Sequence, residues 1–446
     1  TESGSLVVVS KTGNISQTGS LDVDTTSSFT TETDDADITL GHTSNDLTGA
    51  ISLVSTDTNA DNTEIVQLTN NTTGGTILAG STETGSLSVT SILGNISQTG
   101  ALNVGSTSSF STSADDGDIT LTHASNALVG AISLVSTDTN ADNTEVVQLI
   151  NNTTGGTILG GSTETGTLSV TSTFGSITQT GALNIGSTAS FTTSADDADI
   201  TLNEAANALA GAITLISTDT DADDEEGVAI TNSIATVLGG STQSGALSVT
   251  SANGNITQTG SLDVDGITTI SAATNSITLD NTANDFTGVV NVTGMATTIK
   301  DANDIDLGEV SISTLDLVAG GSVTDAVTVS GVKVTGITKV SAGTNIILNS
   351  PSNVFGDSTE LNHSAFTAGN KVIIVEDDKV RAKVVAKSLQ VKGTTGIQLD
   401  DGSAITSLAA SSDSGSIKLL NTGGLSIDDF STDKTRFILE NKLKNK

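Results

Sequence analysis

The chain has 446 residues, and its composition excludes several classes of protein. Trp, Tyr and Cys are absent, and Met and Pro each occur once. A globular core usually relies on aromatic side chains, which bury large areas, and a disulfide scaffold needs cysteine. The apolar residues are mostly Val, Ile, Leu and Ala, which suit thin cores between closely spaced strands. We therefore expect an ordered β protein.

Charge is distributed unevenly along the chain. Residues 12–299 contain 32 acidic residues and no Lys or Arg, whereas residues 300–446 contain 15 basic and 18 acidic residues. Such an acidic stretch repels nucleic acid and anionic membranes and attracts divalent cations. No apolar run approaches the roughly 20 residues that span a bilayer. We expect no nucleic-acid partner and no membrane insertion.

The sequence is organised by an internal repeat. The segment GNISQTGSLDV begins at Gly13, and close copies begin at Gly94, Gly175 and Gly254, in steps of 81, 81 and 79 residues. We predict a β-solenoid over residues 1–355, with periods near 13–93, 94–174, 175–253 and 254–331 and a degenerate copy over 332–355. Residues 356–446 lose the repeat and are predicted to form a C-terminal cap or assembly module.

Short alternating segments within each period predict strands, because a period of two puts one face inward. Helix is disfavoured, since no segment has apolar residues at helical spacing. We expect coils of about 20 residues with two or three short strands each, and about four coils per period. A string of β-sandwiches is the alternative, although sandwiches usually have longer strands and aromatic cores. In the second period the predicted strands are centred on residues 87–89, 102–104, 119–121, 132–134, 147–149 and 158–160.

The repeat also resembles a known family. The succession of ITQTGALNI from residue 177, DITL from residue 118 with GAISL from residue 130, and LGGSTETGTLSVTS from residue 159 resembles the repeats of filamentous haemagglutinin-like bacterial exoproteins. The resemblance covers residues 1–357. It implies an all-β, right-handed parallel β-helix and a surface or adhesive role.

Acidic loops are the most specific candidate sites. DTNADNTE occurs twice and DTDADDEE once, and alternating Asp and Asn side chains can place several oxygens on one side of a turn, as Ca²⁺ requires. The Gly and Glu of an EF-hand, at positions six and twelve, are missing, and a solvated acidic loop is the alternative. No cofactor is required, and Ca²⁺ is the one metal we expect. The candidate ligands are Asp57, Asn59, Asp61, Glu64, Asp138, Asn140, Asp142, Glu145, Asp219, Asp221, Asp223 and Glu226.

A second acidic motif, DDxD, precedes a strand in each of three periods, at residues 34–37, 115–118 and 196–199. We expect it to form a turn. Paired carboxylates occur in glycosidases, but sugar-processing sites usually carry Trp or Tyr, and lyase-type β-helices use Arg or Lys. This stretch has none of these residues, so we expect no enzymatic activity. Phe29, Phe110 and Phe191 recur with the repeat and are expected to be buried.

These features predict an extracellular or cell-surface structural protein, a self-assembling filament or surface-layer subunit. The alternatives are the stalk of a large bacterial adhesin, which would bind a host or surface ligand, and a phage or viral fibre.

The chain opens in mid-period, since TESGSLVVVS aligns with TETGSLSVTS from residue 82. We expect either preceding coils in a longer protein or a head-to-tail homopolymer. In the polymer, basic residues of the C-terminal module meet an acidic partner; these are Lys379, Arg381, Lys383 and Lys387.

Overall fold

The computed structural model is built from strands, and none of the described residues forms a helix. The described residues therefore contain no helix that is long and apolar enough to cross a membrane. The structure describes residues 2–59, 61–79, 82–160, 163–218, 226–240, 242–326, 330–350, 352–355, 364–376, 380–393, 397–412, 417–421, 425–427 and 437–439.

Residues 86–165, about one period in length, show how the repeat folds. This segment contains all six predicted strands, two with the predicted bounds and four with bounds that differ by one or two residues, and four further short strands that we did not predict. The predicted strands are β12 (Ser86–Ser91), β14 (Leu102–Val104), β16 (Ile119–Leu121), β18 (Ala131–Ser136), β19 (Val146–Asn151) and β20 (Thr157–Leu159). The further strands are β13 (Ile96–Gln98), β15 (Ser108–Thr112), β17 (Ala127–Leu128) and β21 (Thr163–Thr165).

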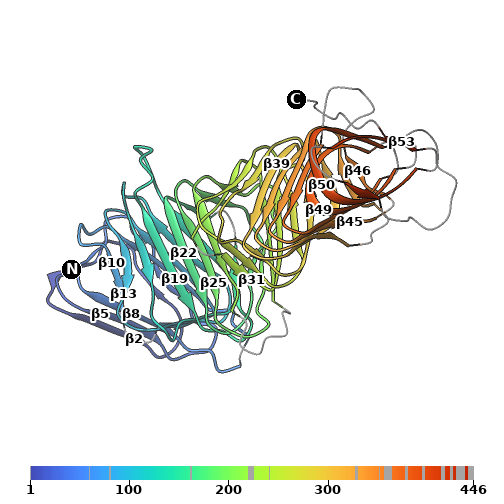
Figure 1. Ribbon diagram of the computed structural model, residues 1–446. Coiled ribbons are helices and arrows are strands. Elements are labelled where there is room, and N and C mark those ends of the chain that lie inside the picture. Colours follow the sequence, from blue (N-terminus) through green and yellow to red (C-terminus); the bar gives the residue numbers. More distant parts are fainter. Residues whose placement is uncertain are drawn as a thin grey trace. The chain divides into compact units, whose positions relative to one another are not determined.

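Each strand pairs in parallel with the corresponding strand of the next coil, as the stacked arrows of Figure 1 show. Leu87 lies beside Ser108, and Ser108 lies beside Ile132. The chain forms about 16 turns, with coils about 21 residues apart. The shortest steps have 17 residues, as from Val289 to Asp306, and long ones have 28, as from Ile38 to Val66. The prediction of a parallel β-solenoid is confirmed.

The strand pairings refine the expectation of about four coils per period. Seven parallel pairings lead from β9 (Ile65–Asn70) to β29 (Gly227–Asn232), which is the same motif two periods later. One period therefore spans three and a half coils. The equivalent strand one period after β9 is β19. It pairs with β16 and β22 (Thr167–Ser172), which belong to a different column of paired strands, or ladder, from the one that contains β9 and β29. The long loop before these strands lengthens the coil and shifts each motif to the other ladder in the next period.

The core contains the residues that alternate inward. Ile119 and Ile200 are fully buried, as are Phe110 and Phe191, and Phe29 is 1% exposed, as predicted. Phe110 packs in register between Val89 and Leu134 of the neighbouring coils. Strand β15 alternates as Ser108, Phe110 and Thr112 inward. The small polar residues that point inward explain why an apolar pattern did not reveal this strand.

Buried amide pairs close one corner of the coils. Gln98 and Asn126 donate to each other's carbonyl oxygen, at 2.8 and 2.9 Å. Fully buried Asn126 also accepts from the N–H of Leu102 and donates to the carbonyls of Leu121 and Ile150. It therefore satisfies backbone groups of three successive coils. The same pair recurs as Gln17 with Asn45, Gln179 with Asn207 and Gln258 with Asn284.

The structure divides into two compact units, residues 1–237 and 238–446. Within the second unit the parallel pairing crosses the predicted boundary at residue 356, since β47 (Ser364–Ala368) pairs with β44 (Thr338–Ala342). Two longer strands follow, β49 (Val380–Gly393) and β50 (Ile397–Ser412), and they also pair in parallel. The capping or assembly role of residues 356–446 stays a prediction.

Replacing Asn126 with Ala should destabilise the fold by at least about 3 kcal/mol. The change leaves Gln98, one backbone N–H and two carbonyls without their partner, and each buried unsatisfied group costs about 1–3 kcal/mol. Urea denaturation measures the loss. The matched control is Asn103→Ala, on the exposed side of β14, which should change stability by less than about 0.5 kcal/mol. Equal effects of the two substitutions would contradict the proposed role of the amide corner.

Asp301 is an acidic variant of a position that is Asn elsewhere in the repeat. Asn70, Asn151 and Asn232 each accept a hydrogen bond from a backbone N–H of the preceding coil. Asp301 accepts the equivalent bond from the N–H of Phe286 at 2.9 Å and a second from that of Asn303 at 2.7 Å. Burial nevertheless raises the pKa of Asp301 above its usual value, and Asp285 and Asp304 add repulsion.

A raised pKa means that the folded state binds the Asp301 proton more tightly than the unfolded state does. The contribution of Asp301 to stability is therefore greatest below the unfolded pKa of 3.8 and is lost as pH rises through the higher folded value. The stability of Asp301→Asn relative to wild type should accordingly be highest at pH 7 and decline towards pH 4. Denaturation midpoints of both proteins across this range test the sign. A difference that is constant with pH would show that Asp301 is not perturbed.

Candidate metal centres between adjacent coils

The loop over residues 57–64 is shaped by its own acidic side chains. The carboxylate of Asp57 accepts hydrogen bonds from the N–H groups of Asn59 and Asn62, both at 3.0 Å. Asn62, the sixth residue counted from Asp57, has a φ of 57°. Asn tolerates this left-handed conformation better than most residues. The loop therefore turns sharply where an EF-hand has Gly, which the sequence pattern did not reveal.

The predicted turn at residues 34–37 is confirmed, and it lies on this loop from the preceding coil. Asp34 accepts from the N–H of Thr58 at 2.7 Å, and Asp35 accepts from the hydroxyl of Thr63 at 2.7 Å. Asp37 accepts from the N–H of Ile65 at 2.9 Å. All three carboxylates of the DDxD motif thus contact the acidic loop of the next coil. The two acidic motifs, which the sequence analysis treated separately, form one cluster.

Glu64 is the centre of this cluster. Its side chain is fully buried, and neither carboxylate oxygen has a hydrogen-bond partner among the described residues. Oxygens of Glu64, Asp57 and Asp61 lie within 4.8 Å of one another, and so do oxygens of Glu64, Asp34 and Asp35. We call these five acidic residues cluster 1. A buried carboxylate among four others can bind a hard cation through oxygen atoms alone.

Cluster 2 repeats this arrangement one period later. Glu145 is fully buried, and its oxygens also have no hydrogen-bond partner among the described residues. They lie within 4.8 Å of Asp138 and Asp142 and, in a second group, of Asp115 and Asp116. From the following coil, Gly166 packs so closely that an added Cβ would lie 2.7 Å from a Glu145 oxygen.

A third group, Asp196, Asp197 and Glu226, has the same spacing, and Glu226 is fully buried. Three of the predicted ligands, Asp219, Asp221 and Asp223, lie outside the described residues. Lys379 does so as well. Arg381, Lys383 and Lys387 lie on β49, and the structure does not describe their side chains. The assembly role of these four basic residues stays a prediction.

Two predicted ligands, Asn59 and Asn140, make hydrogen bonds within the clusters. Their side-chain oxygens accept from the N–H groups of Asp61 and Asp142, each at 3.0 Å. The amide nitrogen of Asn140 donates to Asp115 at 3.1 Å. Both residues therefore shape the loops, and a role as ligands stays a prediction.

The environment shifts the pKa values of the cluster in opposite directions. Burial raises the pKa of Glu64 and of Glu145, and repulsion from nearby Asp carboxylates raises it further. Hydrogen bonds from Thr58 lower the pKa of Asp34, and those from Thr139 lower that of Asp115. These hydrogen bonds favour the ionised forms of Asp34 and Asp115, whereas burial disfavours the ionised forms of Glu64 and Glu145.

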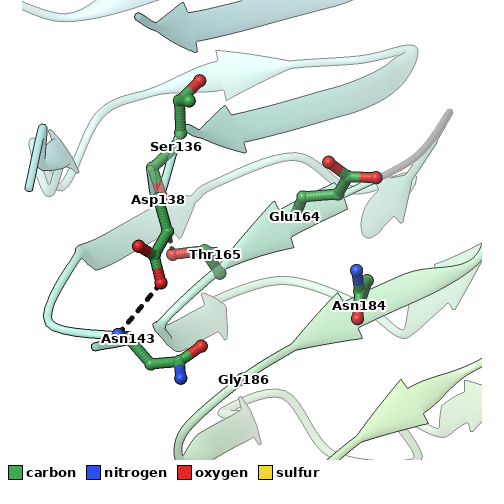
Figure 2. A pocket seen from close by; sticks show the side chains of 8 residues that line it. Ser136, Asp138, Asn143, Glu164, Thr165, Asn184 and Gly186 are labelled. Carbon is green, nitrogen blue, oxygen red and sulfur yellow. Dashed lines mark hydrogen bonds between the residues drawn. The ribbon is translucent and has the colours of Figure 1, made fainter. Parts of the chain in front are cut away.

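A cavity of about 240 Å³ lies beside cluster 2, and Figure 2 shows side chains that line it. Asp138 is the residue of cluster 2 that lines it, and the hydrogen bond from the N–H of Asn143 holds this carboxylate at 3.0 Å. The side chain of Asn143 lies against Gly186, where an added Cβ would overlap its Oδ1. The rest of the lining is Ser136, Thr137, Glu164, Thr165 and Asn184. The cavity is polar and adjoins the cluster.

Comparison with known proteins gives one match. A family model described as "Repeats of unknown function (DUF5649)" matches residues 1–54, 63–135, 145–216, 226–293 and 294–362, more than half of the chain. No curated protein and no solved structure matches. Three of the matched segments begin at or next to a buried glutamate, at residues 63, 145 and 226.

Replacing Glu64 with Gln should stabilise the metal-free protein at pH 7 by about 1–3 kcal/mol. The substitution removes a desolvated charge from among four carboxylates, and the new amide N–H groups can donate to them. Urea denaturation in excess chelator measures the change. Glu32→Gln, which neutralises an exposed carboxylate on the same coil as Asp34, is the control and should have little effect. A destabilised Glu64→Gln protein would show that the buried charge has a favourable partner.

Proposed function

The chain belongs to the family of repeats of unknown function (DUF5649), and from that premise we propose that it is an extracellular or cell-surface structural protein, a self-assembling filament or surface-layer subunit. The observation that carries this proposal is an apolar surface on the first coil. The surface lies on β2 (Leu6–Ser10), and it differs from the same position in later periods.

Val7 and Val9 form this surface. They point outward from β2 and are 72% and 47% exposed. The equivalent outward residues are Ser88 and Thr90 in the second period, and Ser and Thr recur at these positions in the third and fourth. Solvent-facing Val in place of Ser and Thr favours a contact with another protein surface.

The inward side of the same strand also favours a further partner. Leu6 and Val8 are only half-buried, whereas the equivalent Leu87 and Val89 are 2% and 1% exposed. Among the described pairings, β2 has one neighbour, β5 (Ser27–Thr31). A strand edge of this kind pairs readily with another β-strand, and a further coil would cover Leu6 and Val8 as β9 covers Leu87 and Val89.

We propose a second copy of the chain for this place, and a preceding coil of the same polypeptide is the alternative. Identical repeats already stack on one another throughout the ladder, so a coil of another copy has a matching surface. A head-to-tail contact between copies does not close on itself and therefore propagates into a fibre. The resemblance to filamentous haemagglutinin-like exoproteins supports an extracellular or surface location, and it also supports the alternative of an adhesin stalk, in which preceding coils of the same polypeptide would cover β2.

The double substitution Val7→Ser/Val9→Thr, which copies the later periods, should weaken self-assembly at least about tenfold and leave the fold intact. Light scattering over a concentration series and electron microscopy measure assembly, and circular dichroism monitors the fold. Ile65→Thr is the control, because Ile65 is 54% exposed on an internal coil. Assembly in low salt and its loss in high salt would indicate a contact between charges as well. A wild-type chain that stays monomeric at high concentration would contradict the filament and favour the stalk.

A further inference from the structure

We propose that clusters 1 and 2 each bind Ca²⁺ and that the ion joins the acidic turn of one coil to the acidic loop of the next. The proposal is independent of self-assembly, because neither cluster contains a residue of β2. It goes beyond a solvated acidic loop, which would leave its carboxylates in water.

The buried glutamates are the first reason. Glu64 and Glu145 are both 0% exposed, and their four carboxylate oxygens form no hydrogen bond of good geometry with a described residue. Each carboxylate lies near its own backbone N–H, which offsets only part of the cost of burial. Transfer of a carboxylate from water to such a place is strongly unfavourable unless a cation or hydrogen-bond donors replace the water. Both side chains nevertheless lie among four other carboxylates. A bound cation accounts for this arrangement in both copies.

The sequence supplies no basic residue for that role. There is no Lys or Arg between residues 12 and 299, the stretch that contains both clusters. An internal salt bridge from Lys or Arg of this stretch therefore cannot neutralise Glu64 or Glu145. For residues of this stretch, neutralisation therefore falls to a cation or a proton from solution.

The geometry and the donor atoms favour Ca²⁺ among the cations. The oxygens in each group of three lie within 4.8 Å of one another, and an ion with Ca–O distances of about 2.3–2.6 Å can contact all three. Every group contains carboxylates alone, which disfavours Zn²⁺ with its preference for nitrogen and sulfur. Mg²⁺ keeps most of its water and demands strict octahedral geometry, so a crowded set of five carboxylates with a desolvated centre suits it poorly.

Each ion would contact two successive coils. In cluster 1, Asp34 and Asp35 belong to one coil, and Asp57, Asp61 and Glu64 to the next. In cluster 2, Asp115 and Asp116 belong to one coil, and Asp138, Asp142 and Glu145 to the next. Because the repeat spans three and a half coils, the two clusters lie on different ladders. Calcium would therefore reinforce coil stacking at alternating positions along the solenoid.

The test compares Ca²⁺ binding by the full chain and by Glu64→Gln/Glu145→Gln. Equilibrium dialysis and calorimetry in 150 mM salt give the number of bound ions. The matched control is Glu32→Gln/Glu204→Gln, which removes the same net charge from two exposed positions outside the clusters and the cavity. We expect the glutamine variant at the clusters to bind two fewer Ca²⁺ per chain than wild type and the control variant to bind as many as wild type. Mg²⁺ at the same concentration should displace little of the bound Ca²⁺.

Stability provides a second readout. Saturating Ca²⁺, at about 100 times Kd, should raise the denaturation midpoint of wild type and of the control but raise that of Glu64→Gln/Glu145→Gln much less. Circular dichroism in chelator shows whether each variant is folded. Wild type that binds no Ca²⁺, a cluster variant that binds as many ions as wild type, or an equal loss in the control would each overturn the proposal, the last by showing diffuse attraction to the acidic surface.

Discussion

The structure depends on the parallel hydrogen-bonded ladder between successive coils. Each coil buries its inward residues only because another coil lies on either side, and backbone groups that leave the ladder at a corner need other partners. The paired amides of Gln98 and Asn126 provide them, and the same pair occurs in four periods. Inward Ser and Thr beside the aliphatic residues keep the core thin. A core of this kind has no need of the large aromatic residues that the composition lacks.

Stacking also explains why acidic motifs that are distant in sequence meet. Asp35 and Thr63 are 28 residues apart, yet their side chains are 2.7 Å apart, because one coil separates them. The same contact recurs between Asp116 and Thr144. Where the ladder brings five carboxylates together and buries one of them, electrostatic repulsion opposes the stacking that the backbone favours. A cation bound between the carboxylates of adjacent coils would replace this repulsion with attraction. We therefore regard the clusters as candidate cation-binding sites.

The period of three and a half coils has a consequence for any function of the surface. A motif that recurs in every period alternates between two ladders, so residues that look equivalent in sequence do not form one continuous row. Val7 and Val9 stand apart from this alternation, because later periods have Ser and Thr at their positions. A feature confined to one coil suits a contact made once per molecule, whereas the clusters, which recur, suit reinforcement of the solenoid itself.

The sequence by itself determined the fold class, the repeat and most of the strands, since alternating Val, Ile and Leu and the 81-residue spacing are local patterns. It also pointed to the acidic loops, including Glu64 and Glu145. It did not reveal β15, because Ser108 and Thr112 point inward without being apolar, nor the left-handed Asn62, since turn conformation depends on the whole loop. Only the tertiary structure decided that Asp34 and Asp35 join Glu64, and that Glu64 is buried. These facts depend on the number of residues in each coil, which places one segment above another, and residue type alone does not specify that number.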